Sequence, residues 1–190
     1  WIGLANETAH QLGTPTSSLL GWIEYLKDQN VDPMAVEEME KDLSHLRKIV
    51  DRFSKIGSDT PLALANVNEI VGDCVIYFRK RIPRNVTLDY NGFTSEIVHA
   101  MLNSALFEWV VENLLKNSLD ALQGHGEISV RVWATESNVM IDVHDTGKGI
   151  AKSNWKRIFE PGFTTKTRGW GLGLSLSRRV VEEYHRGKIA

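Results

Sequence analysis

Two asparagines, Asn113 and Asn117, lie four residues apart in a segment whose other side chains are mostly apolar. A spacing of four places both side chains on the same face of a helix. Amides in an apolar setting need polar partners, and an amide oxygen is a suitable ligand for a hydrated Mg²⁺ that mainly contacts substrate phosphates. A polar helix face that simply meets water is the alternative interpretation.

A carboxylate, Asp145, stands at the end of an alternating apolar segment and is followed by Gly147 and Gly149. Glycines directly after a strand favour a backbone that passes close to a ligand. The carboxylate could accept a hydrogen bond from an exocyclic amine such as that of adenine. Taken alone, the same residues are equally consistent with an ordinary turn.

A second glycine-rich segment, with Gly169, Gly171 and Gly173, opens the last expected helix. Free backbone N–H groups at a helix N-terminus can hold phosphate oxygens, and Lys166 and Arg168 could add cationic contacts. The spacing differs from the dinucleotide fingerprint and no suitable strand precedes it, so a Rossmann fold is disfavoured. An exposed, flexible basic loop is the alternative.

One histidine, His10, lies in the first helical segment, beside its apolar seam. A lone helical histidine is usually a surface or capping residue. Here Gly13 and Pro15 weaken the next turn, because proline removes a backbone hydrogen bond and glycine favours the unfolded chain. An imidazole in such a segment suits a side chain that must meet two partners, and Thr14 lies on the same face.

The elements that position these residues fall into two parts. Residues 1–58 carry two apolar seams of heptad type, and Asp32 and Pro33 provide the N-cap and first position of the second helix. An antiparallel hairpin of two helices cannot bury both sides of such seams, so we expect a symmetric dimer that forms a four-helix bundle. The seam residues are Ala5, Ala9, Leu12, Thr16, Leu19, Ile23 and Leu26 in the first helix, and Val36, Met39, Leu43, Leu46, Val50 and Phe53 in the second.

Residues 57–61 interrupt this pattern, and we place a domain boundary there. The chain beyond it is expected to mix helices and strands, with a further strand starting at residues 187–190 and an incomplete C-terminal end. The expected helices are 68–82, 103–122 and 172–185, and the expected strands are 86–90, 127–134 and 138–144.

Composition excludes several classes of protein. Twenty-two basic and 24 acidic residues give a formal charge of −2, which argues against a polybasic nucleic-acid surface. The single cysteine, Cys74, excludes an internal disulfide framework and is expected to be a small buried apolar residue. No apolar run approaches the roughly 20 residues that span a bilayer. Since the chain begins at Trp1, we expect it to be part of a larger protein.

These motifs, in this order, resemble the transmitter module of a sensor histidine kinase. The segment 9–15 resembles the phospho-acceptor histidine box, and the segment 113–117 resembles the asparagine box. Three further segments resemble the first glycine box, the phenylalanine box and the second glycine box, in that order: 145–150, 159–163 and 169–174. The resemblance covers nearly the whole chain.

The resemblance implies an α+β protein with two domains. Residues 1–60 would be the dimerisation and histidine-phosphotransfer hairpin of a dimeric four-helix bundle, and residues 61–190 an α/β sandwich that binds ATP, of the Bergerat type. It implies autophosphorylation of His10 by ATP and transfer to an aspartate on the receiver domain of a response regulator. The implied protein is a homodimer, cytoplasmic, without a nucleic-acid partner, and reaches a membrane only through segments absent from this chain.

The resemblance also implies roles for particular residues. Asn117 would be the Mg²⁺ ligand, Asn113 a contact to the phosphates, and Asp145 the partner of the adenine amine. His10, Gln11 and Thr14 would act at the phospho-acceptor site. The full set expected to contact ATP is Asn113, Lys116, Asn117, Asp145, Gly147, Gly149, Ile150, Lys166, Arg168, Gly169, Gly171, Leu172 and Gly173.

The chain departs from the family at Gln11, because most relatives carry an acidic residue after the histidine. An amide oxygen can accept a hydrogen bond but cannot take up a proton at pH 7. Three interpretations compete: Gln11 only fixes the imidazole tautomer while water takes the proton, Glu7 substitutes as the acceptor, or autokinase activity is weak. The third leads to an alternative function, a nucleotide-responsive dimeric phosphatase or interaction module.

Thr14 occupies the place where relatives position water for dephosphorylating the regulator, which predicts phosphatase activity as well. An ATPase of the gyrase or chaperone type would share the nucleotide site. It is disfavoured because those proteins lack the histidine hairpin and use a glutamate where this chain has Asn113.

Overall fold

The computed structural model describes residues 2–29, 31–37, 39–40, 43–44, 61–166 and 171–190, with side chains in the first helix described from Pro15 onward. The chain divides into two compact units, Trp1–Thr60 and Pro61–Ala190, which we treat separately. Among the described residues, no helix combines the length and the apolar character needed to cross a bilayer.

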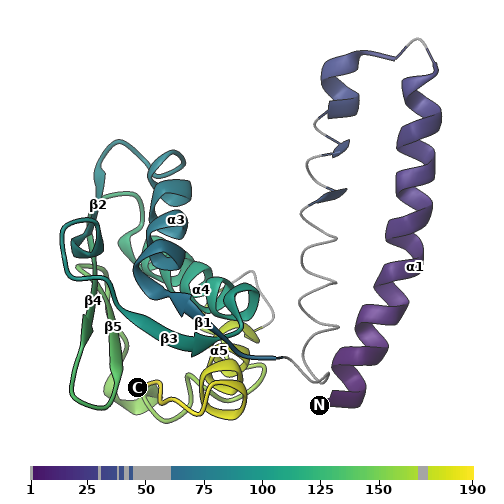
Figure 1. Cartoon of the computed structure of the whole chain (residues 1–190). Coiled ribbons are helices and arrows are strands. Elements are labelled where there is room, and N and C mark those ends of the chain that lie inside the picture. The colour runs from purple at the N-terminus through teal and green to yellow at the C-terminus, as the bar shows by residue number, and fades with distance from the viewer. Residues whose placement is uncertain (1, 30, 38, 41–42, 45–60, 167–170) are drawn as a thin grey trace. The chain divides into compact units, whose positions relative to one another are not determined.

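The first unit is built on the long helix α1 (Ile2–Lys27), seen in purple in Figure 1. The helix continues through Pro15. Residues 33–37, 39–40 and 43–44 are also helical, and Asp32 Oδ1 accepts a hydrogen bond from the Met34 N–H at 3.0 Å, as an N-cap does. Ile23 packs against Val36 and Leu43, so the two helical segments share an apolar contact.

The apolar seam of the first unit is buried only in part. Thr16 and Ile23 are 6% exposed, whereas the seam residues Leu19 and Met39 are 49% and 46% exposed. Lys27 of α1 forms an ion pair with Glu24 of the same helix and a second with Glu40, and the pair with Glu40 ties the two helical segments together at one end. The hydrogen bonds that the Lys27 ammonium donates to the Glu40 and Glu24 carboxylates raise the pKa of Lys27 above its ordinary value. The seam residues Leu46, Val50 and Phe53 and the side chains of Ala5, Ala9 and Leu12 lie outside the described residues.

The second unit combines helices and strands. The longer helices are α3 (Val67–Arg79), α4 (Ser104–Leu122) and α5 (Gly173–Arg179), and α5 continues into the wider π-type turn η3 (Val180–Tyr184). The strands are β1 (Ala63–Asn66), β2 (Val86–Tyr90), β3 (His99–Leu102), β4 (Gly126–Ala134) and β5 (Val139–Asp145). Short 3-10 turns are η1 (Asn91–Phe93) and η2 (Lys152–Asn154).

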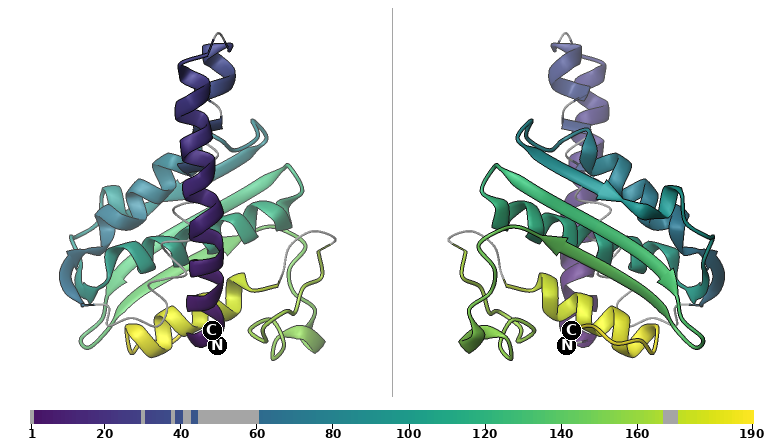
Figure 2. Two further views of the ribbon diagram at one scale, coloured as in Figure 1. Left: turned by 90° about the vertical axis from the view of Figure 1, so that its right-hand side faces the viewer. Right: turned by 90° about the vertical axis from the view of Figure 1, so that its left-hand side faces the viewer.

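The strands form two sheets. In the larger sheet β2 runs parallel to β4, and β4 pairs with β5 in antiparallel fashion, with Val130 opposite Val143. In the smaller sheet β1 pairs with β3 in antiparallel fashion, with Leu64 opposite Met101. Helices α3 and α4 lie on one face of the larger sheet (Figures 1 and 2). This arrangement is the α/β layer architecture expected for the nucleotide-binding part.

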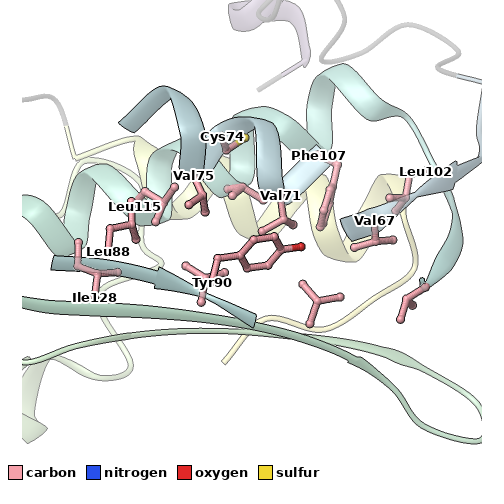
Figure 3. Packing of buried hydrophobic residues seen from close by; sticks show 14 of the residues in the cluster. Val67, Val71, Cys74, Val75, Leu88, Tyr90, Leu102, Phe107, Leu115 and Ile128 are labelled. Atoms are coloured by element: carbon pink, nitrogen blue, oxygen red, sulfur yellow. The ribbon is translucent and has the colours of Figure 1, made fainter. Parts of the chain in front are cut away.

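The main core lies between these two helices and the larger sheet (Figure 3). Its helical members point toward the strands, and alternate residues of β2 and β4 point back. The labelled residues in Figure 3 are Val67, Val71, Cys74, Val75, Leu88, Tyr90, Leu102, Phe107, Leu115 and Ile128. The buried position of Cys74 confirms that it is a small apolar residue of the core.

Helix α4 is buried on two sides, which explains why most of its residues are apolar. Phe107, Val111 and Leu115 face the main core, whereas Leu106 and Val110 form a second cluster with Val180 of the C-terminal helix. The helix begins at an asparagine cap, because Asn103 Oδ1 accepts a hydrogen bond from the Leu106 N–H at 3.1 Å. It ends where Gln123 adopts a left-handed conformation with φ of 54°.

The C-terminal helix is anchored to the start of α4 by His185. The Asn103 N–H donates to His185 Nε2 at 3.0 Å, and His185 Nδ1 lies 2.8 Å from the Val180 carbonyl oxygen. An imidazole that accepts at Nε2 must carry its proton at Nδ1, so these contacts select one neutral tautomer. The bond from Asn103 links the end of η3 to the start of α4.

Three features of the second unit differ from the sequence predictions. Strands β1 and β3 were not predicted, and the expected strand at 187–190 is not formed. The helix expected over 68–82 ends at Arg79, because the chain turns before Pro83. Four-residue strands such as β1 and β3 carry too little alternation to be recognised, and they gain their hydrogen bonds only by pairing with each other.

Candidate nucleotide-binding site

Helix α4 presents a row of small and polar residues at intervals of four: Asn113, Asn117 and Ala121. Residues at this spacing follow one another along a single helix face. Each contacts a different glycine-rich or basic segment of the second unit. Three motifs that are distant in the sequence therefore meet along one side of α4.

At the first of these contacts, Asn113 meets the start of α5. Asn113 Nδ2 donates a hydrogen bond to Ser177 Oγ at 2.9 Å, and Ser177 is fully buried. A β-carbon added to Gly173 would lie 2.4 Å from Asn113 Oδ1, so any larger residue would displace the Asn113 side chain from this position. The Asn113 side chain is thus held against the N-terminal turn of α5, where free N–H groups favour anions.

At the second contact, Asn117 meets the segment before α5. Lys166 Nζ donates to Asn117 Oδ1 at 2.8 Å and to Asp120 Oδ2 at 2.7 Å. Two oxygens on one helix therefore converge on one cation. This arrangement fits a divalent metal such as Mg²⁺, which takes one or two protein oxygens and completes its shell with water and phosphate.

At the third contact, Ala121 meets the first glycine segment. A β-carbon on Gly147 would lie 2.7 Å from the Ala121 carbonyl carbon, and the Lys148 N–H donates to the Ala121 oxygen at 3.2 Å. Gly147 N–H donates to Asp145 Oδ1 at 2.9 Å, which orients the carboxylate at the end of β5. Within the described part of the chain, no hydrogen bond is made to Asp145 Oδ2.

The two remaining glycine positions have left-handed backbones. Gly171 has φ of 64°, and its β-carbon would lie 2.6 Å from Gly162 and Phe163, so the second glycine box packs against the phenylalanine box. The Gly162 N–H donates to the Gly171 oxygen at 3.1 Å. Gly149 has φ of 66° but open space around its α-carbon.

Other predicted site residues are placed less specifically. Ile150 is half exposed, and its carbonyl oxygen accepts from Trp155 Nε1 at 2.9 Å. Leu172 precedes α5, and its carbonyl oxygen accepts from the Ser175 hydroxyl at 2.9 Å. Lys116 is exposed on α4.

Several predicted residues cannot be placed in the site. Arg168 and Gly169 lie outside the described residues, as do the side chains of His10, Gln11 and Thr14, whose backbones belong to α1 in the other unit. Of the basic segment, Lys166 lies on the surface, where its ammonium group contacts two side chains of α4.

Comparison with known proteins agrees with this geometry. Residues 103–190, which include every described contact of the site, match the family described as histidine kinase-, DNA gyrase B- and HSP90-like ATPases. The chain also matches histidine kinases, with identities of 26–29%. The chain is similar to sensor histidine kinases over nearly its whole length. Its second unit has the α/β architecture of this ATPase family, and it shares the fold of the catalytic domain of histidine kinase ThkA.

The relatives span both units of the chain. The signal transduction histidine-protein kinase AtoS of Escherichia coli is 26% identical over 187 residues, which is 95% of this chain but 31% of AtoS. The catalytic domain of histidine kinase ThkA is 28% identical, with a TM-score of 0.59 over 67% of this chain and 84% of that domain. The complex of ThkA with the response regulator protein TrrA shares the fold, with 23% identity and a TM-score of 0.58 over 98% of this chain and 56% of that one.

Three contacts of the site were not predicted: those of Asp120, Ala121 and Ser177. Asp120 and Ala121 follow Asn117 by three and four residues, so the helical spacing that singled out the asparagines also marks them. Ser177 follows Gly173 by four residues and could have been found in the same way. None of the three belongs to the five motif segments, so their roles emerge only from the folded structure.

Proposed function

We propose that this chain is the transmitter part of a sensor kinase that uses ATP to phosphorylate His10 and passes the phosphoryl group to an aspartate of a response regulator. The observation that carries the proposal is the meeting of three separate motifs along one face of α4, at Asn113, Asn117 and Ala121. The chain spans only about a third of AtoS, so its sensing segments and stimulus are not addressed by this proposal.

In this proposal the second unit holds ATP and Mg²⁺. Asn117 ligates the metal, Asn113 and the start of α5 with Gly171, Leu172 and Gly173 contact phosphates, and Lys166 adds positive charge. The bound metal neutralises phosphate charge and helps to align the γ-phosphoryl group. Asp145 receives the adenine amine through its free oxygen, and the glycines of 147–150 let the backbone lie close to the base.

The phosphoryl acceptor is the unprotonated ring nitrogen of His10. A bond forms from this nitrogen to the γ-phosphorus while the bond from phosphorus to the bridging oxygen breaks, and ADP leaves. The other ring nitrogen then loses its proton. Gln11 is suited to accept a hydrogen bond from this N–H and so to fix the tautomer, while water takes the proton.

The first unit is proposed to form a homodimer through a four-helix bundle. The exposed apolar residues Leu19, Trp22 and Met39 support this role, because a second hairpin would cover them. The same unit is proposed to meet the receiver domain of the regulator, in line with the complex formed by ThkA and TrrA. Thr14 is proposed to position water for dephosphorylation of that regulator.

Gln11 keeps a second function open, a dimeric phosphatase or interaction module with little autokinase activity. Its amide cannot accept a proton, unlike the acidic residue of most relatives. Transfer of the labelled γ-phosphoryl group from ATP to the protein distinguishes an autokinase from a phosphatase or interaction module.

The test is incubation of the purified chain with γ-labelled ATP and Mg²⁺, followed by measurement of acid-labile, alkali-stable label. We expect label in the wild type, none in His10→Gln, and at least a tenfold reduction in Asn117→Ala. Asn138→Ala, in the turn between β4 and β5, is the matched control and should label normally. A chase with excess ADP and a receiver domain then measures phosphatase activity, which Thr14→Ala should reduce.

Absence of label in a wild-type chain that still binds ATP would overturn the autokinase and favour the phosphatase or interaction module. Label that persists in His10→Gln would overturn His10 as the acceptor. Label that falls in Glu7→Gln but not in Gln11→Ala would identify Glu7 as the proton acceptor in place of water.

A further inference from the structure

Lys166 contacts a carboxylate, Asp120, as well as Asn117, and its proposed phosphate-binding role does not explain this carboxylate. A lysine that only meets phosphates needs no carboxylate beside it. Here the ammonium lies 2.7 Å from Asp120 Oδ2 and 2.8 Å from Asn117 Oδ1, although it is 46 and 49 residues away in the chain. Asp120 has no role in the site as described so far.

The two oxygens are fixed more firmly than the cation. Asn117 and Asp120 are three residues apart on α4, between the buried residues Leu115, Ser118 and Leu122. Their backbone positions are therefore set by the core. Lys166 reaches them through a flexible four-carbon side chain, so it can withdraw without disturbing the helix.

We propose that Asn117 and Asp120 form one cation position with two alternative occupants, the ammonium group of Lys166 and the divalent metal that accompanies the nucleotide. Asp120 is the positioning residue of this exchange. It holds Lys166 when the metal is elsewhere, and it supplies a second oxygen, directly or through water, when the metal binds. The inference rests on the proposed function only for the identity of the metal.

The relative strengths of the two interactions favour exchange of the Lys166 ammonium for the metal. The Lys166 and Asp120 side chains are 40% and 44% exposed, and ion pairs of this exposure are weak. A divalent ion carries twice the charge of the ammonium and prefers carboxylate and amide oxygens. Metal entry therefore releases Lys166 at little cost, and the freed ammonium becomes available to the phosphates. In this way one carboxylate couples metal binding to the position of the segment before α5.

The first test uses Mn²⁺ alone as the probe, with free Mn²⁺ measured by electron paramagnetic resonance in the absence of nucleotide. Lys166→Met removes the competing ammonium and should raise the affinity for Mn²⁺ by roughly two- to five-fold. Lys152→Met is the matched control, because it removes the same charge from an exposed lysine of η2. Asp120→Asn should weaken Mn²⁺ binding, and Lys166→Met should then have no further effect in that background.

The second test measures the accessibility of the Lys166 amine. Acetylation of Lys166, quantified by mass spectrometry against Lys152, should increase when Mg²⁺ is added at constant ionic strength. In Asp120→Asn the same amine should react readily whether or not Mg²⁺ is present. Circular dichroism checks that each variant is folded.

Equal Mn²⁺ affinities for Lys166→Met and Lys152→Met would overturn the exchange, and so would Mn²⁺ affinity that is unchanged in Asp120→Asn. Lys166 acetylation that does not change when Mg²⁺ is added would also overturn the proposed exchange. Neither test uses ATP or His10, so these failures are distinct from a failure of the proposed kinase activity, which the labelling experiment detects.

Discussion

The two units of the chain differ in how completely they bury their apolar residues. In the second unit Val67, Val71, Leu115 and Ile128 are at most 1% exposed and belong to one continuous core. In the described part of the first unit the cluster consists of Ile23, Val36 and Leu43, with Leu20 and Leu26 beside it. The second unit therefore stabilises itself.

The first unit leaves large side chains uncovered. Trp22, Tyr25 and Met34 are 62%, 56% and 72% exposed, and Trp22 and Tyr25 pack edge to face with their ring centres 6.1 Å apart. Two helices have too few neighbours to cover such residues, so we expect the first unit to gain stability by association, as the proposed four-helix bundle would provide. This difference is the basis for the proposal that the first unit associates with a second copy, whereas the second unit buries its own core.

The largest expected effect concerns the core of the second unit. Leu115→Ala removes a fully buried side chain and should lower the free energy of unfolding of this unit by about 2–5 kcal/mol. Hydrogen exchange measured by mass spectrometry reports the two units separately, through peptides from α1 and from α4. Leu19→Ala, the same change at a residue that is 49% exposed, is the control and should leave α4 unaffected. Equal losses of protection in α1 and α4 for Leu115→Ala would show that the units are not independent.

A second prediction uses the buried phenol of the same core. Tyr90 is 7% exposed and its hydroxyl donates to the Asn68 carbonyl oxygen at 2.9 Å. Burial, with a smaller contribution from Cys74, raises the pKa of Tyr90 to about 12 from an ordinary value of 10.0. Between pH 10 and 12 the folded chain keeps a proton that the unfolded chain has released, so stability is complete below pH 10 and falls as the pH rises.

The loss across this window should amount to roughly 2–3 kcal/mol in the second unit. Chemical unfolding of the wild type and of Tyr90→Phe at several alkaline pH values measures it, because the variant lacks the titrating group. Tyr77→Phe, at a tyrosine that is 46% exposed, should keep the pH dependence of the wild type. A Tyr90→Phe curve parallel to that of the wild type would contradict the prediction.

The difference between local and long-range contacts explains which features the sequence could predict. Helix α4 was predicted within one residue, because its apolar periodicity and its cap at Asn103 are local signals. Strands β1 and β3 were missed, because they are stabilised by each other across a gap of 32 residues between Asn66 and His99. Local signals specify an element, and only folding brings distant partners together.

The features of the site also fall into those set by local spacing and those set by long-range folding. The spacing of Asn113 and Asn117 predicted that both lie on one face of a helix, and both contact segments near the C-terminus of the chain. The contact between Asp120 and Lys166 could not be predicted, because it depends on how the chain returns to α4 after β5. Asp145 was predicted as a ligand of the base, but its bond to the Gly147 N–H, which orients it, emerges only in the folded turn.

The smallest expected effect per step, and the sharpest test of the comparison, is the dependence of each unit on protein concentration. If association completes the first unit, each tenfold rise in concentration should stabilise α1 by about 0.7 kcal/mol per protomer, because the dissociated fraction of a dimer is proportional to the inverse square root of concentration, whereas α4 should not respond. Hydrogen exchange at two concentrations measures both helices in one sample. Trp22→Glu places a charge on the exposed apolar face and should abolish the concentration effect in α1, whereas Glu24→Gln, at an exposed residue of the same helix, should preserve it. Protection of α1 that is equal at all concentrations would mean that the exposed face of the hairpin is covered by something other than a second copy of the chain.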